Sequence, residues 1–132
     1  MAEAQDVHGT VFKNGSATLL ARVVGANGLL LTPAAISSVT YSVFLLDDQD
    51  PDSQTAVTGH GDVPLAVNGV LYDTLQRDNV WTKDDVGYNF KHVLDVSDHP
   101  AFAVAGRSYR VLFALTPSSG QVILVRFRVH AI

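Results

Sequence analysis

The stretch that decides the fold is residues 107–131, RSYRVLFALTPSSGQVILVRFRVHA. Bulky apolar side chains recur at every second position on both sides of a central turn, at Tyr109, Val111, Phe113, Leu115, Ile123, Val125, Phe127 and Val129. A period of two residues is typical of a β-strand with one buried face. The residues between the two runs, Pro117-Ser118-Ser119-Gly120, have the chemistry of a four-residue turn. The pattern therefore predicts a hairpin of strands over 107–116 and 121–131 that share one buried face.

The rest of the chain shows the same short-period patterning. It predicts strands over 11–13, 17–24, 38–46, 63–67, 69–76 and 88–96, separated by turns rich in Gly, Pro, Asn and Asp. No long segment has the 3.6-residue period of an amphipathic helix. We therefore expect an all-β, antiparallel β-sandwich of about seven strands. We expect residues 1–9 to be a flexible N-terminal arm, able to add to a neighbour's sheet edge, and residues 10–132 to form one domain.

The composition favours a protein partner over a nucleic acid or a membrane. Charged residues are 17% of the chain, below the usual share of about 25%. Either part of the surface is covered by a partner, or the sandwich has uncharged polar faces. The net charge of −4 provides no general attraction for phosphates, and the apolar runs are too short to span a membrane. There is no cysteine, and the first residues lack the features of a secretion signal.

The sequence carries no recognisable catalytic or metal-binding motif. Aspartates alternate in the acidic loop 47–52 as in a calcium loop, but Ser53 and Gly59 stand where that loop has Gly and Glu. The histidines, at positions 8, 60, 92, 99 and 130, lack zinc-site spacing. There is neither a G-x-S-x-G elbow nor a glycine-rich phosphate loop. We expect no catalytic residue, no metal and no cofactor, and we leave open whether the acidic loop binds a cation.

The arginines of the final hairpin form the first candidate interface. Arg110, Arg126 and Arg128 alternate with the apolar positions and therefore belong to the opposite face. Pairing of the two strands would bring their side chains to within about 5 Å of one another. Acidic residues gather instead in loops 47–52 and 84–85. This segregation favours contacts with neighbouring copies, although a plain solvated face explains the arginines as well.

Aromatic residues form the second candidate interface. Trp81 is followed closely in the sequence by Tyr88 and Phe90. Such side chains either anchor a partner or a carbohydrate, or plug one end of a sandwich.

Two sets of motifs resemble known proteins. Gly106-Arg107-Ser108-Tyr109-Arg110-Val111 and the two strands after it resemble the last hairpin of immunoglobulin-like domains. That resemblance implies that Tyr109 forms a tyrosine corner, in which its hydroxyl binds upstream backbone. Residues 71–76, 81–84 and 87–90, with Gly106-x-x-Tyr109, resemble small immunoglobulin-like structural proteins of tailed bacteriophages, including baseplate-upper-protein-like modules.

The phage resemblance spans residues 16–131 and implies a role. The chain would be a non-enzymatic structural component of a virion, in the neck, tail, baseplate or head surface, assembled in the host cytoplasm. Its partners would be other virion proteins and further copies of itself, with neither nucleic acid nor membrane. The alternative is a carbohydrate- or receptor-binding β-sandwich module that uses Trp81, Tyr72 and Tyr88.

Overall fold

The computed structural model describes residues 6–24, 29–47, 49–50, 53–76, 87–97, 99–118 and 121–132, with the backbone alone for 6–9. Two short helical turns are present in this part of the chain, η1 (Pro33–Ala35) and α1 (Val67–Val70). The strands are β1 (Asp6–Val11), β2 (Thr18–Ala21), β3 (Ile36–Leu46), β4 (Gln54–Ala56), β5 (Val63–Leu65), β6 (Leu71–Gln76), β7 (Tyr88–Val93), β8 (Ser108–Pro117) and β9 (Ile123–Ala131).

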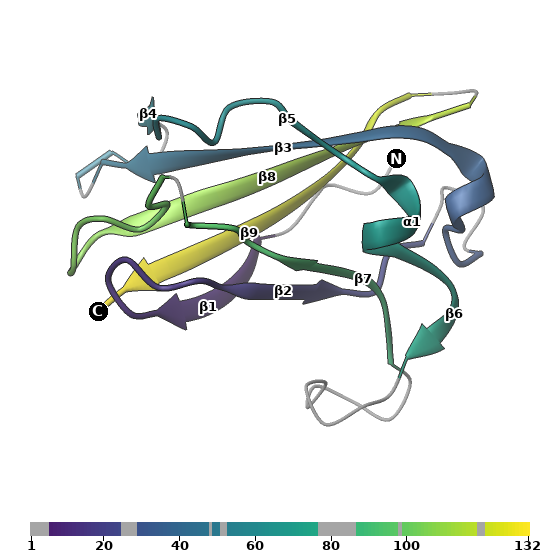
Figure 1. The fold of residues 1–132 in the computed structure, drawn as a ribbon, viewed down its shortest axis with the longest axis horizontal. Coiled ribbons are helices and arrows are strands. Elements are labelled where there is room, and N and C mark those ends of the chain that lie inside the picture. Colours follow the sequence, from purple (N-terminus) through teal and green to yellow (C-terminus); the bar gives the residue numbers. More distant parts are fainter. Residues whose placement is uncertain are drawn as a thin grey trace.

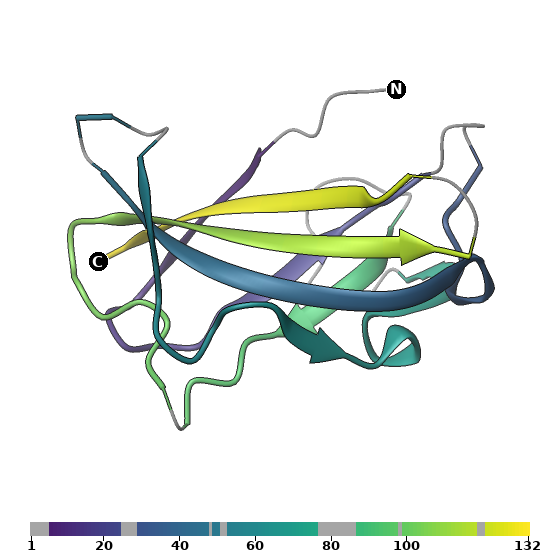
Figure 2. The same cartoon turned by 90° about the horizontal axis from the view of Figure 1, so that it is seen from above.

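The strands form two packed sheets, which confirms the all-β sandwich. The large sheet has the order β1-β9-β8-β3-β4, with β5 also paired to β3, and the small sheet has the order β2-β7-β6. The long strands β3, β8 and β9 lie side by side, and β2 and β7 cross beneath them (Figures 1 and 2). No helix in the described residues is long and apolar enough to cross a membrane.

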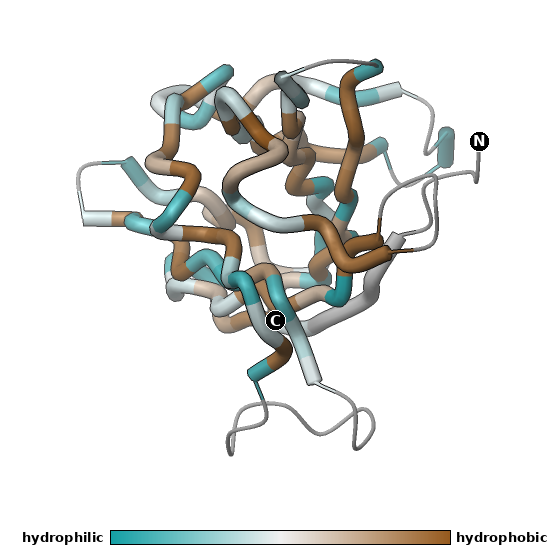
Figure 3. The backbone as a smooth tube through the Cα atoms, turned by 90° about the vertical axis from the view of Figure 1, so that its right-hand side faces the viewer, coloured by the Kyte–Doolittle hydropathy of each residue, from teal (hydrophilic) through white to brown (hydrophobic). Residues whose placement is uncertain are grey.

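The final hairpin forms with the predicted shared face. β8 pairs antiparallel with β9, so that Val111 lies opposite Phe127 and Phe113 opposite Val125. Phe113 is fully buried and meets Phe90 of β7 edge to face, with ring centroids 4.8 Å apart. Hydrophobic and hydrophilic residues alternate along the chain in Figure 3, as expected where one side of each strand faces the core. The aromatic rings of the two sheets therefore join in one core.

The N-terminal segment differs from the prediction. β1 pairs in parallel with β9, from Asp6 opposite Arg126 to Val11 opposite Ala131, so residues 6–9 belong to the sheet. Residues 6–9, which the sequence analysis assigns to the arm, are therefore part of strand β1, and the otherwise antiparallel sandwich contains one parallel strand pair. Residues 1–5 lie outside the described part of the chain. The local sequence does not predict β1, because this strand is stabilised by pairing with β9, which lies far away in the chain.

Asn14 and Gly15 form a tight turn between β1 and β2, two strands that do not pair with each other. Asn14 has a φ of 60°, and the N–H of Gly15 donates to the carbonyl of Phe12 at 2.8 Å. The turn carries the chain from β1 in the large sheet to β2 in the small one. A turn motif determines a chain reversal, whereas the choice of sheet depends on which apolar faces must be covered.

Asn89 joins the loop after β2 to strand β7. Its side chain is fully buried, and its Oδ1 accepts the N–H of Val23 at 2.7 Å. Its Nδ2 donates to the carbonyls of Val23, at 3.0 Å, and Leu31, at 2.8 Å. Every polar atom of the amide group thus has a partner, which is what makes a buried asparagine tolerable.

Candidate functional site

The arginines predicted from the final hairpin lie together on the side of the large sheet that faces away from the core. Arg110 of β8 is directly opposite Arg128 of β9, and Leu112 is opposite Arg126. Directly paired residues place their Cβ atoms about 4.5–5.5 Å apart. We call Arg110, Leu112, Leu124, Arg126 and Arg128 the basic outer face.

Arg128 is a half-buried member of this face. It makes no hydrogen bond or ion pair with any residue of the described part of the chain. Its neighbour Arg110 donates from Nη1 to the Oε1 of Gln54 on β4, at 3.4 Å. Like charges that face each other across a strand pair are unfavourable. A negatively charged group bound at Arg128 would offset this unfavourable pairing of like charges.

Apolar side chains are exposed beside the arginines. Leu124 precedes Arg126 on the same face of β9 and is 45% exposed, and Val122 before the strand is 46% exposed. His130 continues the row and lies 3.4 Å from the hydroxyl of Ser108 through its Nδ1. Arginine heads together with accessible leucine and valine surface are typical of protein interfaces.

The acidic loop is built as a turn. The carboxylate Oδ1 of Asp47 accepts the backbone N–H groups of Gln49, at 2.8 Å, and Asp50, at 3.1 Å. These hydrogen bonds, with a smaller contribution from Arg107, lower the pKa of Asp47. An arginine therefore lies near this acid, and the charges are less segregated than the sequence suggests. Asp48 and Asp52 are outside the described residues, within which no group of three or more His, Asp or Glu is placed to hold a metal ion.

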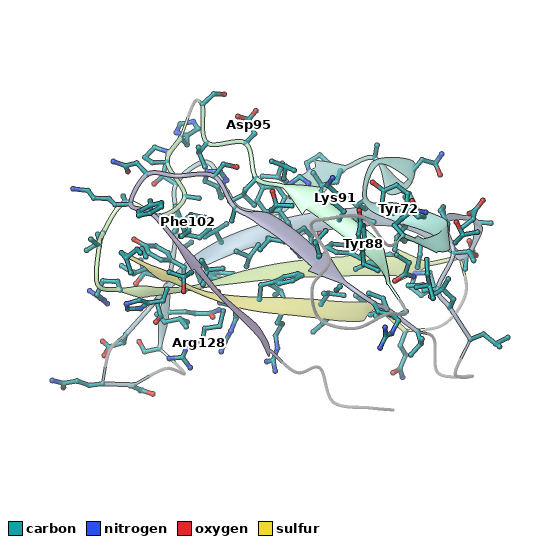
Figure 4. All side chains as sticks on the ribbon, turned by 90° about the horizontal axis from the view of Figure 1, so that it is seen from below. Tyr72, Tyr88, Lys91, Asp95, Phe102 and Arg128 are labelled. Atoms are coloured by element: carbon teal, nitrogen blue, oxygen red, sulfur yellow. The ribbon has the colours of Figure 1, made fainter. Side chains whose placement is uncertain are left out.

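The aromatic candidate interface is not supported where the structure describes it. Tyr88 is only 2% exposed, and its ring lies edge to face with Tyr72, with centroids 6.1 Å apart (Figure 4). The burial of Tyr88 therefore favours the alternative in which these aromatic residues fill one end of the sandwich. Tyr88 is buried because it shares the inward face of β7 with Phe90, which is part of the core. Trp81 lies outside the described residues.

Tyr109 holds the segment before β8 against that strand. The backbone N–H of Val104 donates to the Tyr109 hydroxyl oxygen at 2.9 Å, across a separation of five residues. The Tyr109 side chain is 2% exposed, and its ring meets Phe102 edge to face. A tyrosine corner is defined by a contact of this kind, from the hydroxyl at the start of a strand to backbone a few residues upstream.

The fold brings Tyr41 and three histidines together in a cluster that the sequence did not indicate. The hydroxyl of Tyr41 on β3 lies 2.8 Å from Nδ1 of His60, and Nε2 of His60 lies 2.7 Å from the carbonyl oxygen of His99. The ring of His92 on β7 packs against Tyr41, with centroids 5.3 Å apart. Burial raises the pKa of Tyr41, with an added contribution from Asp95, and burial lowers the pKa of His92.

Only a weak sequence signal marks this cluster. The alternation of Tyr88, Phe90 and His92 places His92 on the inward face of its strand. Nothing in the spacing of the histidines indicates that His60 and His99 meet, because they come from different loops.

Comparison with known proteins gives no match: no family model, no curated protein and no solved structure matches this chain. Its function therefore has to be inferred from the fold and the surface.

Proposed function

We propose that this protein is a non-enzymatic, immunoglobulin-like assembly module of a tailed-phage virion, in its neck, tail, baseplate or head surface. Its basic outer face binds an acidic surface of a neighbouring virion protein. The observation that carries the proposal is the pairing of Arg110 with Arg128, next to Arg126 and exposed Leu124, on a sheet face directed away from the core.

The strand order supports the immunoglobulin-like assignment. In immunoglobulin domains the strands B, E and D form one sheet, and the strands C, F and G form the centre of the other. Here β2, β7 and β6 form the small sheet, while β3, β8 and β9 are adjacent in the large one. Tyr109, near the start of β8, binds upstream backbone in the position of the tyrosine corner.

The charge distribution supports an acidic protein partner. The whole chain has a net charge of −4 and nine Lys and Arg residues, three of which lie on this one face. A guanidinium group binds a carboxylate through two parallel hydrogen bonds, which gives orientation as well as attraction. Exposed Leu124 adds apolar surface that such a contact would bury.

The test uses Arg128→Glu and a matched control, Lys91→Glu. Both are cations in the middle of a strand, and they lie on opposite sides of the sandwich (Figure 4). The purified proteins are mixed with the products of the genes next to this one, and the mass of the complexes is measured by light scattering at low and high salt. We expect a salt-sensitive complex with wild type and Lys91→Glu, and none with Arg128→Glu. The proposal fails if wild type binds none of these products, or if Arg128→Glu binds as wild type does.

A further inference from the structure

Strand β1 forms one edge of the large sheet, and its outer side has no partner in the described part of the chain. It stands last in the strand order and pairs only with β9 among the described residues. In Figure 1 it lies beside β9, away from β4 and β5 at the opposite edge of the sheet. An unpaired strand edge presents a row of backbone N–H and C=O groups that another strand can bind.

The hydrogen bonds at the end of β1 show which backbone groups face outward. The N–H of Ile132 donates to the carbonyl of Val11 at 2.8 Å, and the N–H of Lys13 donates to the carbonyl of Ile132 at 2.9 Å. The odd-numbered residues of β1 therefore direct their N–H and C=O groups toward β9. Because this direction alternates along a strand, the groups of residues 6, 8, 10 and 12 point away from the sheet.

The other edge strands of the two sheets carry features that hinder such pairing, and β1 does not. β2 has four residues and β4 has three, β5 contains Pro64, and the register of β6 is irregular between Leu71 and Gln76. Short strands, prolines and bulges make an edge a poor template for a further strand. β1 has six residues in unbroken register, with neither a proline nor a lysine.

Gly9 indicates the kind of strand that fits this edge. A glycine inside a strand often marks a point where another backbone approaches closely. Two copies of β1 that pair antiparallel can form hydrogen bonds only where even-numbered residues oppose each other. The register that uses the whole stretch from residue 6 to residue 12 places His8 opposite Thr10 and Gly9 opposite itself, on a two-fold axis. Residues opposed between two hydrogen-bonded pairs have Cα atoms about 4.5 Å apart, the closest spacing in an antiparallel pair, and glycine leaves that space free.

Exposed apolar side chains lie next to the edge. Phe12 is 75% exposed and Ile132 is 53% exposed. They follow Val11 and Ala131, which are paired in register and face the core, so Phe12 and Ile132 lie side by side on the outer side of the sheet. A strand added at this edge would lie directly beside Phe12 and remove part of its ring from water, which is favourable.

We propose that two copies of this chain pair antiparallel along the outer edges of their β1 strands, with Gly9 on the two-fold axis, so that their large sheets join into one. A second copy fits this edge because a single register gives each outward N–H from residue 6 to residue 12 an acceptor on the same edge of the other copy. The inference goes beyond the proposed function and does not depend on it, since the strand edge is separate from the basic outer face.

The mass of the purified protein, measured by light scattering over a concentration series up to about 1 mM, tests the pairing. We expect wild type to approach twice the chain mass of 14.2 kDa, and Thr10→Pro to keep the mass of one chain. Proline removes the outward N–H of residue 10 and none of the β1–β9 hydrogen bonds, so this variant should keep the circular dichroism spectrum of wild type. The matched control, Thr10→Val, keeps the N–H and should form the dimer as wild type does.

Introduced cysteines locate the register, since the chain has none of its own. His8→Cys and Thr10→Cys are oxidised, each alone and in a mixture. Opposed residues of a hydrogen-bonded pair have Cα atoms about 5.5 Å apart, within the disulfide range of about 4.4–6.8 Å, whereas the two copies of residue 10 are about 7–8 Å apart. We expect the mixture to give a covalent dimer that mass spectrometry identifies as one chain of each variant, and each variant alone to give several-fold less.

Three results would overturn the proposal: wild type that stays a monomer at every concentration, a folded Thr10→Pro that still forms the dimer, or cysteine variants that cross-link as well alone as in the mixture. If Thr10→Pro does not fold, the cysteine variants decide. None of these results bears on the acidic partner, whose binding the Arg128→Glu variant tests separately.

Discussion

Replacing Asn89 with alanine removes the amide group that ties the loop after β2 to β7. The N–H of Val23 and the carbonyl of Leu31 each lose a partner, while the carbonyl of Val23 still accepts the N–H of Leu31 at 3.0 Å. Two buried backbone groups are left unsatisfied, at about 1–3 kcal/mol each. We therefore expect Asn89→Ala to lower the free energy of unfolding by at least ~2 kcal/mol, and the melting midpoint by roughly 8 °C.

Urea unfolding followed by fluorescence measures this loss, and hydrogen exchange locates it. The control is Asn68→Ala, an exposed residue in α1, which should change stability by less than about 0.5 kcal/mol. In Asn89→Ala the amide of Val23 should exchange far faster than in wild type. If Asn89→Ala costs under 1 kcal/mol, or if the Val23 amide stays protected, then the described network does not hold this loop.

Four further changes test the fold. Tyr109→Phe removes the acceptor for the N–H of Val104 and should cost about 1 kcal/mol in urea unfolding; an unchanged midpoint would contradict the corner contact. Phe113→Ala, at the centre of the core, should cost about 3–5 kcal/mol by the same assay, and a cost under 1 kcal/mol would contradict its burial. Gly59→Ala forces a Cβ against His99 at an unfavourable φ, so exchange of the His60 amide should accelerate at neutral pH; an unchanged rate would contradict the close approach. Deleting residues 1–11 should lower the melting midpoint by removing β1 from β9; an unchanged midpoint would contradict the β1–β9 pairing.

The alternation of apolar and polar residues was sufficient to predict the buried side of those strands whose two faces differ sharply in polarity. In β8–β9 each inward position is apolar and each arginine is outward, so a shift of one residue would bury charge. The same alternation holds in the segment around β2, where Leu19, Ala21 and Val23 lie on the buried side. The placement of Arg110 and Arg128 on one outer face followed directly, because both the hairpin and its faces were predictable, whereas their direct pairing comes from the structure.

The closeness of Trp81 and Tyr88 in the sequence left two interpretations of Tyr88 open, an exposed anchor and a core residue. Which neighbouring rings a side chain meets depends on the second sheet, and β7 turns Tyr88 toward the core beside Phe90. A cluster of aromatic residues in the sequence is thus compatible with either an exposed platform or a filled interior.

The sequence by itself determined the class of the fold, the shared buried face of the final hairpin and the row of arginines, because these depend on two-residue periodicity and on turn residues close together in the chain. Only the tertiary structure decided that β1 runs parallel to β9, that Asn89 joins the loop after β2 to β7, and that His60 meets Tyr41 and His99. Those contacts join residues far apart in the chain. Their stability comes from burying polar groups with their partners, and that depends on the complete arrangement of both sheets.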